Sequence, residues 1–191
     1  MCVSSRHTEP VLILLPPSEK KSPTAGPAIE VYTGVLYTAL GWSTLTAAQR
    51  KLAHSWIVII SARYAAVRPQ DPIEPYKEKI NNKEKAPKVA SVLNGIKTDL
   101  IIDCRSSTYQ TVWKSPTEKT VEVKVFTHVD GEKKIVTHMS KKTRGEVTRH
   151  ILLAGIDIKT PQELLEVVSQ AFTCTLIDAS EKEPWVLEVY C

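Results

Sequence analysis

The strongest indication of the fold is Val11-Leu12-Ile13-Leu14-Leu15, which Pro16-Pro17-Ser18-Glu19-Lys20 follows directly. An unbroken apolar run of this length is typical of a strand buried on both faces, and the two prolines end it. Residues 56–60 (Trp-Ile-Val-Ile-Ile) and 99–104 (Asp-Leu-Ile-Ile-Asp-Cys) form two similar runs. Because helix-like segments, one of them over 83–93, separate the runs, we expect the strands to pair in a mostly parallel sheet.

Helix signals lie before the second strand and after the third. Residues 46–55 predict a helix with Thr44 or Thr46 as its N-cap. Another helix is expected over about 140–154. Thr160-Pro161-Gln162-Glu163 combines an N-cap, a proline at the first helical position and a capping-box acid, so a further helix is expected to start there.

Residues 120–138 predict an antiparallel hairpin. Val121, Val123 and Val125 share one face of this segment, and the residues between them share the other, which is the two-residue period of a strand. Asp130-Gly131 favours a type I′ turn. Residues 173–177 and 185–190 predict two strands that close the chain.

These elements predict one α/β (α+β) domain over residues 1–191, with a mixed, mostly parallel central sheet, a β-hairpin and helices on the outside. The length of 191 residues and the apolar content of 42% suffice for one core, which must be aliphatic because aromatic residues make up only 6%. Residues 1–10 are polar, and we expect them to form a flexible tail. The net charge of +4 favours an anionic partner.

Several classes of protein do not fit this sequence. The apolar run 11–15 is too short for a signal sequence or a membrane span, so we expect a cytoplasmic protein without a membrane partner. The histidines lack metal-ligand spacing, and glycine-rich nucleotide-binding motifs are missing, so we expect neither a metal nor a cofactor. The cysteines lack C-x-x-C spacing, and we expect reduced thiols at Cys2, Cys104, Cys174 and Cys191.

Each of the three buried strands is followed by a polar, partly basic cluster. The clusters contain Ser18 with Lys20, Ser61 with Arg63, and Arg105 with Ser106. The carboxyl ends of parallel strands converge on one crevice, which is the usual ligand position in an open sheet. We therefore expect these residues, with Arg68 and Lys141, to border one cationic concave site. The alternative is that loops after strands are polar in any case.

A basic segment, Ser140-Lys141-Lys142-Thr143-Arg144-Gly145-Glu146-Val147-Thr148-Arg149, follows the predicted hairpin. Four cations in ten residues at the start of a helix are well placed to bind phosphate or a carboxylate. Cations in a first turn oppose the helix dipole, and an anion bound there would remove that cost. The alternative is a solvated helix face.

Short elements with a characteristic order occur along the chain. They are Leu14-Leu15-Pro16-Pro17-Ser18-Glu19-Lys20, Tyr32-Thr33-Gly34-Val35, Ser61–Asp71, Pro75-Tyr76-Lys77, Asp103–Tyr109 and Lys141-Lys142-Thr143-Arg144-Gly145. Their order resembles the YaaA family of peroxide-stress proteins. The segment between Lys20 and Tyr32 is shorter than in usual members, and Arg63-Tyr64-Ala65-Ala66 replaces a Leu-Tyr-Gly element. The chain is thus similar to a shortened, divergent member.

The resemblance implies a compact α/β fold with a helix-hairpin-helix-like element and a positively charged cleft. It also implies a role in limiting damage by hydrogen peroxide, with DNA as the ligand. A nucleotide-like small molecule is the other partner that such a cleft suits, because the missing segment removes surface that could carry a DNA-binding element. The alternative function is therefore an enzyme that acts on a small anionic or nucleobase-like substrate. A third hypothesis is a partner-binding protein with a degenerate cleft.

The same residues are candidates under the first two hypotheses. The candidate anion-binding residues are Ser18, Lys20, Arg63, Arg68, Tyr76, Arg105, Lys141 and Arg144. Ser61, Ser106 and Tyr109 are the candidate catalytic residues, which would position a substrate or relay protons. Cys104 next to Arg105 is either a reactive thiol with a lowered pKa or an inert buried cysteine.

Overall fold

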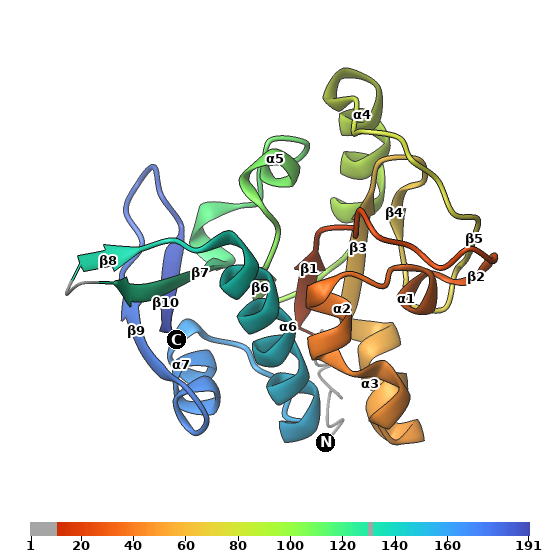
Figure 1. Cartoon of the computed structure of the whole chain (residues 1–191). Coiled ribbons are helices and arrows are strands. Elements are labelled where there is room, and N and C mark those ends of the chain that lie inside the picture. Colours follow the sequence, from red (N-terminus) through yellow and green to blue (C-terminus); the bar gives the residue numbers. More distant parts are fainter. Residues whose placement is uncertain (1–10, 130–131) are drawn as a thin grey trace, which may run out of the picture.

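The computed structural model describes residues 11–129 and 132–191. At its centre, parallel strands lie side by side in the order β3, β1, β6, β7 and β10 (Figure 1). Their bounds are Leu12–Leu15 for β1, Ile57–Ser61 for β3, Ile101–Asp103 for β6, Thr120–Val129 for β7 and Trp185–Tyr190 for β10. The mostly parallel sheet expected from the buried runs is therefore confirmed.

Antiparallel strands complete the sheet. Strand β4 (Ala65–Val67) pairs with β3 at one edge, and β9 (Thr173–Ile177) pairs with β10 at the other. Strand β8 (Glu132–Lys134) pairs with β7, which confirms the predicted hairpin, although its turn residues 130–131 and the predicted tail 1–10 lie outside the described residues. Two residues of β2 (Gly26–Pro27) and two of β5 (Pro72–Ile73) pair separately.

Helices cover both faces of the sheet. They are α1 (Ala28–Val31), α2 (Val35–Leu40), α3 (Ala47–Trp56), α4 (Asn82–Leu93), α5 (Ser107–Gln110), α6 (Thr137–Ala154) and α7 (Pro161–Ser169). Short 3₁₀ turns occur at Trp42–Thr44 and Thr117–Lys119. The predicted capping signals are confirmed, because Thr46 caps α3 in a capping box with Gln49 and Thr160 caps α7 in one with Glu163.

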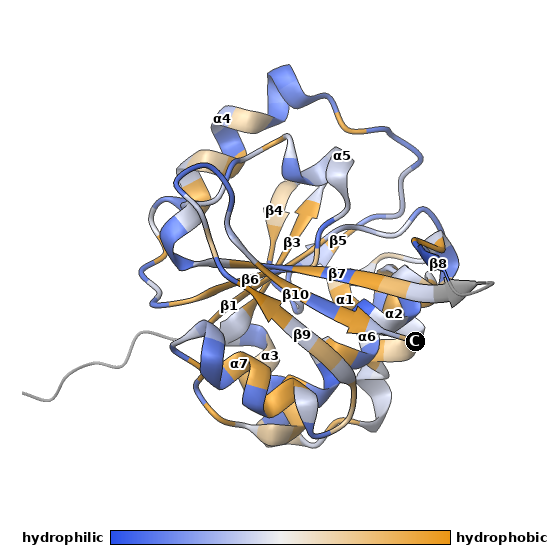
Figure 2. Ribbon diagram, turned by 90° about the vertical axis from the view of Figure 1, so that its left-hand side faces the viewer, coloured by the Kyte–Doolittle hydropathy of each residue, from blue (hydrophilic) through white to orange (hydrophobic). Residues whose placement is uncertain are grey.

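The core explains why the strands are apolar on both sides (Figure 2). Ile13 and Leu15 of β1 belong to the larger apolar cluster, which includes side chains of α1, α2, α3, α6 and α7. Leu12 and Leu14, on the opposite face of the same strand, pack in a second cluster with side chains of α4. Alternate residues of a strand point to opposite faces, so a strand between two helix layers must be apolar throughout.

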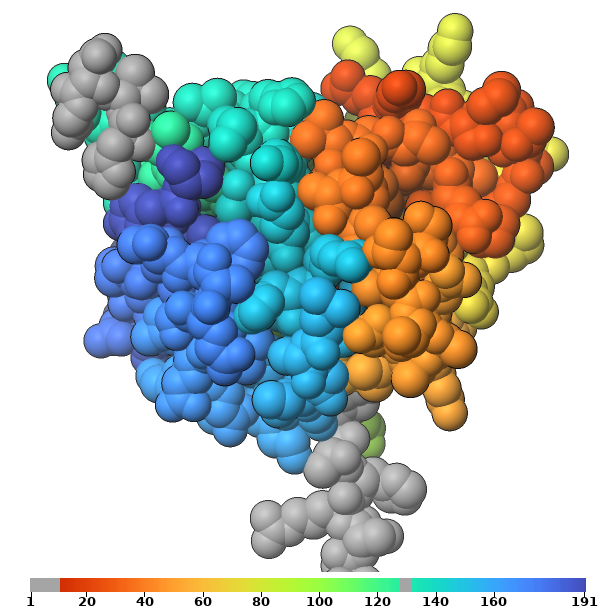
Figure 3. Space-filling view, turned by 60° about the horizontal axis from the view of Figure 1, so that its bottom comes forward, coloured from red at the N-terminus to blue at the C-terminus, as the bar shows by residue number. Residues whose placement is uncertain are grey.

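Helix α2 packs against α6, and this contact places residues 35–40 beside the basic segment (Figure 3). The close approach requires Gly145, because a Cβ there would overlap the carbonyl oxygen of Leu36. Arg149 of α6 donates from Nη1 to the carbonyl oxygens of Leu40 and Gly41, at 3.0 and 3.1 Å, and so caps the end of α2. Gly41 itself has the left-handed φ of 66°.

Candidate functional site

A cleft of about 960 Å³ lies beside the segments that follow β1 and β6. Its lining comes from distant parts of the sequence, namely the 16–21 loop, α2, the loop at Tyr76, α5, β7 and α6. The sequence-predicted residues in this lining are Ser18, Lys20, Tyr76, Ser106, Tyr109, Lys141 and Arg144. The structure thus brings together side chains from the first and third polar clusters and from the basic segment, while Ser61, Arg63, Arg68 and Arg105 are placed elsewhere.

Ser61 lies beneath the cleft and is fully buried. Its Oγ is 2.8 Å from the hydroxyl of Tyr76 and accepts a hydrogen bond from the hydroxyl of Tyr32 at 3.1 Å. The two tyrosine hydroxyls are themselves 2.8 Å apart, so three hydroxyl groups form one buried cluster. Because Tyr76 also lines the cleft, Ser61 reaches a ligand there only through Tyr76.

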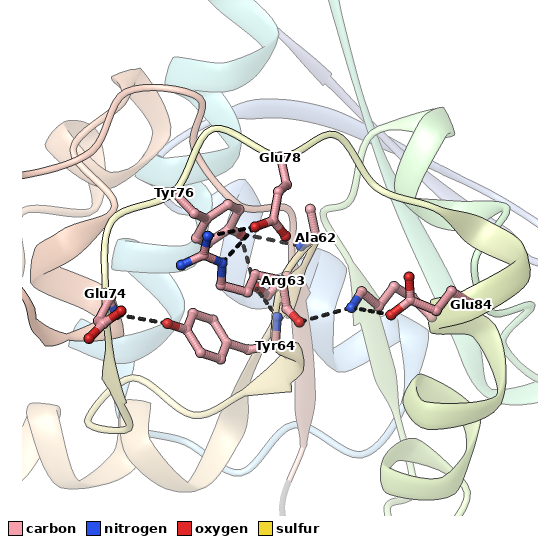
Figure 4. Close-up of polar contacts among 9 residues, drawn as sticks. Ala62, Arg63, Tyr64, Glu74, Tyr76, Glu78 and Glu84 are labelled. Atoms are coloured by element: carbon pink, nitrogen blue, oxygen red, sulfur yellow. Dashed lines mark hydrogen bonds and ion pairs between the residues drawn. The ribbon is translucent and has the colours of Figure 1, made fainter.

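Arg63 is exposed, and its guanidinium is used within the protein (Figure 4). It donates from Nε to Glu78 at 2.7 Å and forms an ion pair with the same carboxylate through Nη2, at 2.6 Å. Glu78 is part of the cleft lining, whereas Arg63 is not. Arg63 therefore neutralises an acidic group at the edge of the cleft.

The expectation that Arg68 borders this site is wrong. Its Nη1 donates to the carbonyl oxygens of Ser55 and Ile57, at 2.7 and 3.2 Å. These carbonyl groups stand where α3 passes into β3, which is the amino end of that strand. The sequence placed Arg68 near the carboxyl end because it follows Ser61 closely, but the antiparallel strand β4 carries the chain back along β3.

The expectation that Arg105 borders the cleft is also wrong. Arg105 and Asp103 are each 1% exposed, and they form a bidentate pair with Nε–Oδ1 and Nη2–Oδ2 distances of 2.9 and 2.8 Å. Nη1 donates to the carbonyl oxygens of Tyr109 and Trp113, at 3.1 and 3.0 Å. Arg105 therefore holds α5, and with it Ser106 and Tyr109, against the sheet.

Ser18 and Lys21 form the floor of the cleft with Gly34. The Oγ of Ser18 donates to the carbonyl oxygen of Lys20 at 2.6 Å, and a Cβ on Gly34 would overlap that Oγ. Lys21, which the sequence analysis missed, donates to the carbonyl oxygen of Ser18 at 2.8 Å. Its Nζ lies 4.1 Å from the centre of the Tyr76 ring, which is a cation–π contact.

The α6 side of the cleft carries the basic segment. Arg144 donates from Nε to the carbonyl oxygen of Val123 at 3.2 Å, and Lys142 forms an i,i+4 ion pair with Glu146 at 3.4 Å. Helix α6 begins at Thr137, earlier than expected, so Lys141 lies in its second turn. The expectation that these cations stand in the first turn of the helix, beside its free N–H groups, is therefore wrong.

Burial sets the ionisation of several groups around the cleft. It raises the pKa of Tyr109 to about 12, and it raises the pKa of Tyr32 well above its ordinary value of 10.0, so both hydroxyls stay protonated at neutral pH. Burial also raises the pKa of the Cys104 thiol to about 12, against the weaker opposite effect of the Arg144 charge. Of the two alternatives for Cys104, this environment favours the inert thiol.

Comparison with known proteins identifies the family. The model of the family "Peroxide stress protein YaaA" matches residues 14–175, a range that includes all residues of the cleft lining. The chain belongs to the YaaA peroxide-stress family. The YaaA resemblance drawn from short elements is therefore confirmed.

Curated relatives carry the name UPF0246 protein. One from Streptomyces coelicolor is 32% identical over 183 residues, which cover 87% of this chain and 70% of the relative. A second, from Corynebacterium efficiens, is 32% identical and covers 89% of this chain and 72% of the relative. A third, from Corynebacterium glutamicum, is 29% identical and covers 85% and 69%. This YaaA-family chain thus matches more than two thirds of the length of each.

Two structural findings concern the part of the chain that the structure describes. Within residues 11–129 and 132–191, no helix is both long and apolar enough to cross a membrane. Within the same residues, no three histidine, cysteine or acidic side chains are grouped as metal ligands would be.

Proposed function

We propose that this YaaA-family protein binds nucleic acid in its cleft as part of the response to hydrogen peroxide. The family supplies the link to peroxide stress. The observation that carries the binding proposal is a set of cleft cations which form no salt bridge within the described residues: Lys20, Lys21, Lys141 and Arg144.

The cleft lining also contains carboxylates, and most of them are already paired with other cations. Glu78 is paired with Arg63, and Glu146 is paired with Lys142. Glu19 remains as an acidic group in the lining. A cleft with unpaired cations on two of its sides attracts polyanions, and phosphate groups can replace the missing carboxylate partners.

Aromatic side chains in the same cleft support a nucleic acid rather than a simple inorganic anion. Tyr109 lines it from α5 and is half-buried, whereas Tyr76 on the floor is buried, with Lys21 over its ring. Base–aromatic stacking contributes about 1–3 kcal/mol per base in single-strand binding proteins. The combination of cations and tyrosines therefore fits a ligand that carries both phosphates and bases.

The test is the salt dependence of binding to fluorescent single-stranded and duplex oligonucleotides. Affinity should fall steeply between about 50 and 200 mM salt, because each neutralised phosphate contributes about −0.7 to −0.9 to the logarithmic slope. Lys141→Ala combined with Arg144→Ala should flatten that slope by about one to two. Lys159→Ala, outside the cleft lining, is the matched control. Binding that is absent, or unchanged in the double variant, would refute the proposal.

A second candidate function is catalysis on a small anionic or nucleobase-like substrate, with Ser106 and Tyr109 touching the substrate and Ser61 acting through Tyr76. The cleft volume of about 960 Å³ favours it, because ligand pockets usually have about 300–1,000 Å³. A thermal-shift screen with nucleotides and small acids tests this candidate. A stabilising ligand whose effect persists at high salt would favour it over nucleic-acid binding.

A further inference from the structure

Lys21 has surroundings unlike those of an ordinary surface lysine. Its Nζ is 4.1 Å from the Tyr76 ring centre and 5.7 Å from that of Tyr32, and it donates to the carbonyl oxygen of Ser18. It forms no salt bridge within the described residues, in contrast to Lys85, which pairs with Glu84. Lys21 therefore presents an amine in the cleft with aromatic rings and a carbonyl group as its neighbours.

These surroundings act on the charge of the amine. Burial lowers the pKa of Lys21 below its usual value of 10.5, and the nearby carboxylate of Glu19 opposes the change. A desolvated lysine is neutral in a larger fraction of molecules, and only the neutral amine has the lone pair that attacks a carbonyl carbon. The geometry thus provides the placement that a nucleophilic lysine needs, and burial shifts the amine towards its neutral form.

We infer that Lys21 is a nucleophile that forms an imine with the aldehyde of a phosphate-bearing ligand. The Nζ lone pair attacks the carbonyl carbon, the carbon–oxygen bond breaks, and the oxygen leaves as water with the two protons of the amine. Formation of this carbon–nitrogen double bond releases water and requires no oxidant or reductant. The inference rests on the proposed function, because the cleft must bind the ligand before Lys21 can react with it.

The ligand chemistry follows from the rest of the cleft. Lys141 and Arg144 are suited to phosphate groups, and the aldehyde must reach the floor where Lys21 lies. An abasic site in DNA, a lesion that oxidants produce, places the aldehyde of its open deoxyribose between two phosphates. A free sugar phosphate with an aldehyde presents the same pair of groups, so the two sources must be separated by experiment.

The experiment is borohydride trapping, since borohydride reduces an imine to a stable secondary amine. The full chain is incubated with a duplex oligonucleotide containing one abasic site, with the intact duplex, or with glyceraldehyde 3-phosphate. Mass spectrometry should place the adduct from the abasic duplex on Lys21, and the intact duplex should give none. Lys21→Arg keeps a cation at this position but has no amine that forms the imine, so it should lose the adduct at an oligonucleotide concentration that saturates its binding. Lys97→Ala removes an exposed lysine outside the cleft and should keep both duplex affinity and the adduct.

The outcomes separate this inference from the proposed function. Duplex binding without trapping, or an adduct that persists in Lys21→Arg, would overturn the role of Lys21 and leave nucleic-acid binding intact. Trapping of glyceraldehyde 3-phosphate on Lys21 without duplex binding would support the nucleophile and reject the nucleic-acid function. Failure of all three probes to bind or react would overturn both. Circular dichroism of each variant checks that the loss of an adduct is not a loss of fold.

Discussion

Replacement of Arg105 by methionine should destabilise the protein strongly, although the sequence suggested that this residue binds ligand. The side chain makes two hydrogen bonds to Asp103 and two to main-chain carbonyl groups, at 2.8 to 3.1 Å. Both charged side chains are 1% exposed, so Arg105→Met leaves a buried carboxylate without its cation. Breaking a buried pair in this way costs about 3–5 kcal/mol.

Urea denaturation followed by circular dichroism measures this cost, with an unchanged slope as the check that unfolding remains two-state. In the native protein, the backbone N–H of residue 105 donates to the Asp103 carboxylate at 3.0 Å. Adding Asp103→Asn to Arg105→Met removes the unpaired charge and keeps a side-chain oxygen that can accept this hydrogen bond. The double variant should therefore recover about 1–3 kcal/mol relative to Arg105→Met alone. Arg63→Met, which breaks an exposed pair, is the matched control and should leave the urea midpoint unchanged. A decrease in the free energy of unfolding below about 1 kcal/mol for Arg105→Met would refute the reasoning, because an unpaired buried charge destabilises a protein by more than that.

Further predictions concern the helix contact, the thiols and the basic segment. Gly145→Ala should lower the free energy of unfolding by about 1–3 kcal/mol in urea denaturation, because the new methyl group overlaps the α2 backbone, and an unchanged midpoint would show that the contact can relax. A thiol reagent at pH 8 should modify the exposed Cys191 in the native protein and spare the buried Cys104, whose pKa is raised to about 12. In denaturant without reductant, the reagent should count four free thiols, and a count of two would mean a disulfide. Lys141→Ala should leave the melting temperature unchanged, since this exposed side chain forms no salt bridge within the described residues, and a clear fall would reveal an internal partner.

Local chemistry explains which parts of the fold could be predicted. The capping boxes of α3 and α7 are complete within four residues, so sequence identifies both helix starts. Helix α2 was missed because it has six residues and follows Gly34, and its packing depends on a glycine more than a hundred positions away in α6. Strand β4 was missed as well; its first residue, Ala65, has a φ of 66°, which is uncommon for a residue other than glycine.

The same contrast holds for the candidate site. Lys20 and Lys21 are neighbours with equal charge, and only the fold decides that Lys21 packs on the Tyr76 ring. For Arg105 a signal was present, because Asp103 stands two positions earlier and alternate residues of an extended chain share a face. A carboxylate at that spacing in a buried strand favours an internal pair over a free cation.

The position of Lys21 on the cleft floor depends on a series of contacts that starts at Gly34. Only glycine at position 34 leaves room for the Ser18 hydroxyl, and that hydroxyl donates to the Lys20 carbonyl oxygen. The loop is thereby closed in a conformation in which the Ser18 carbonyl oxygen accepts from the Lys21 Nζ. Charge on the α6 side of the cleft can vary without disturbing this arrangement, because Lys141 and Arg144 belong to a different element. Ligand attraction and the reactive amine are thus separable properties of this fold, and Lys21→Arg and the Lys141→Ala, Arg144→Ala double variant address them one at a time.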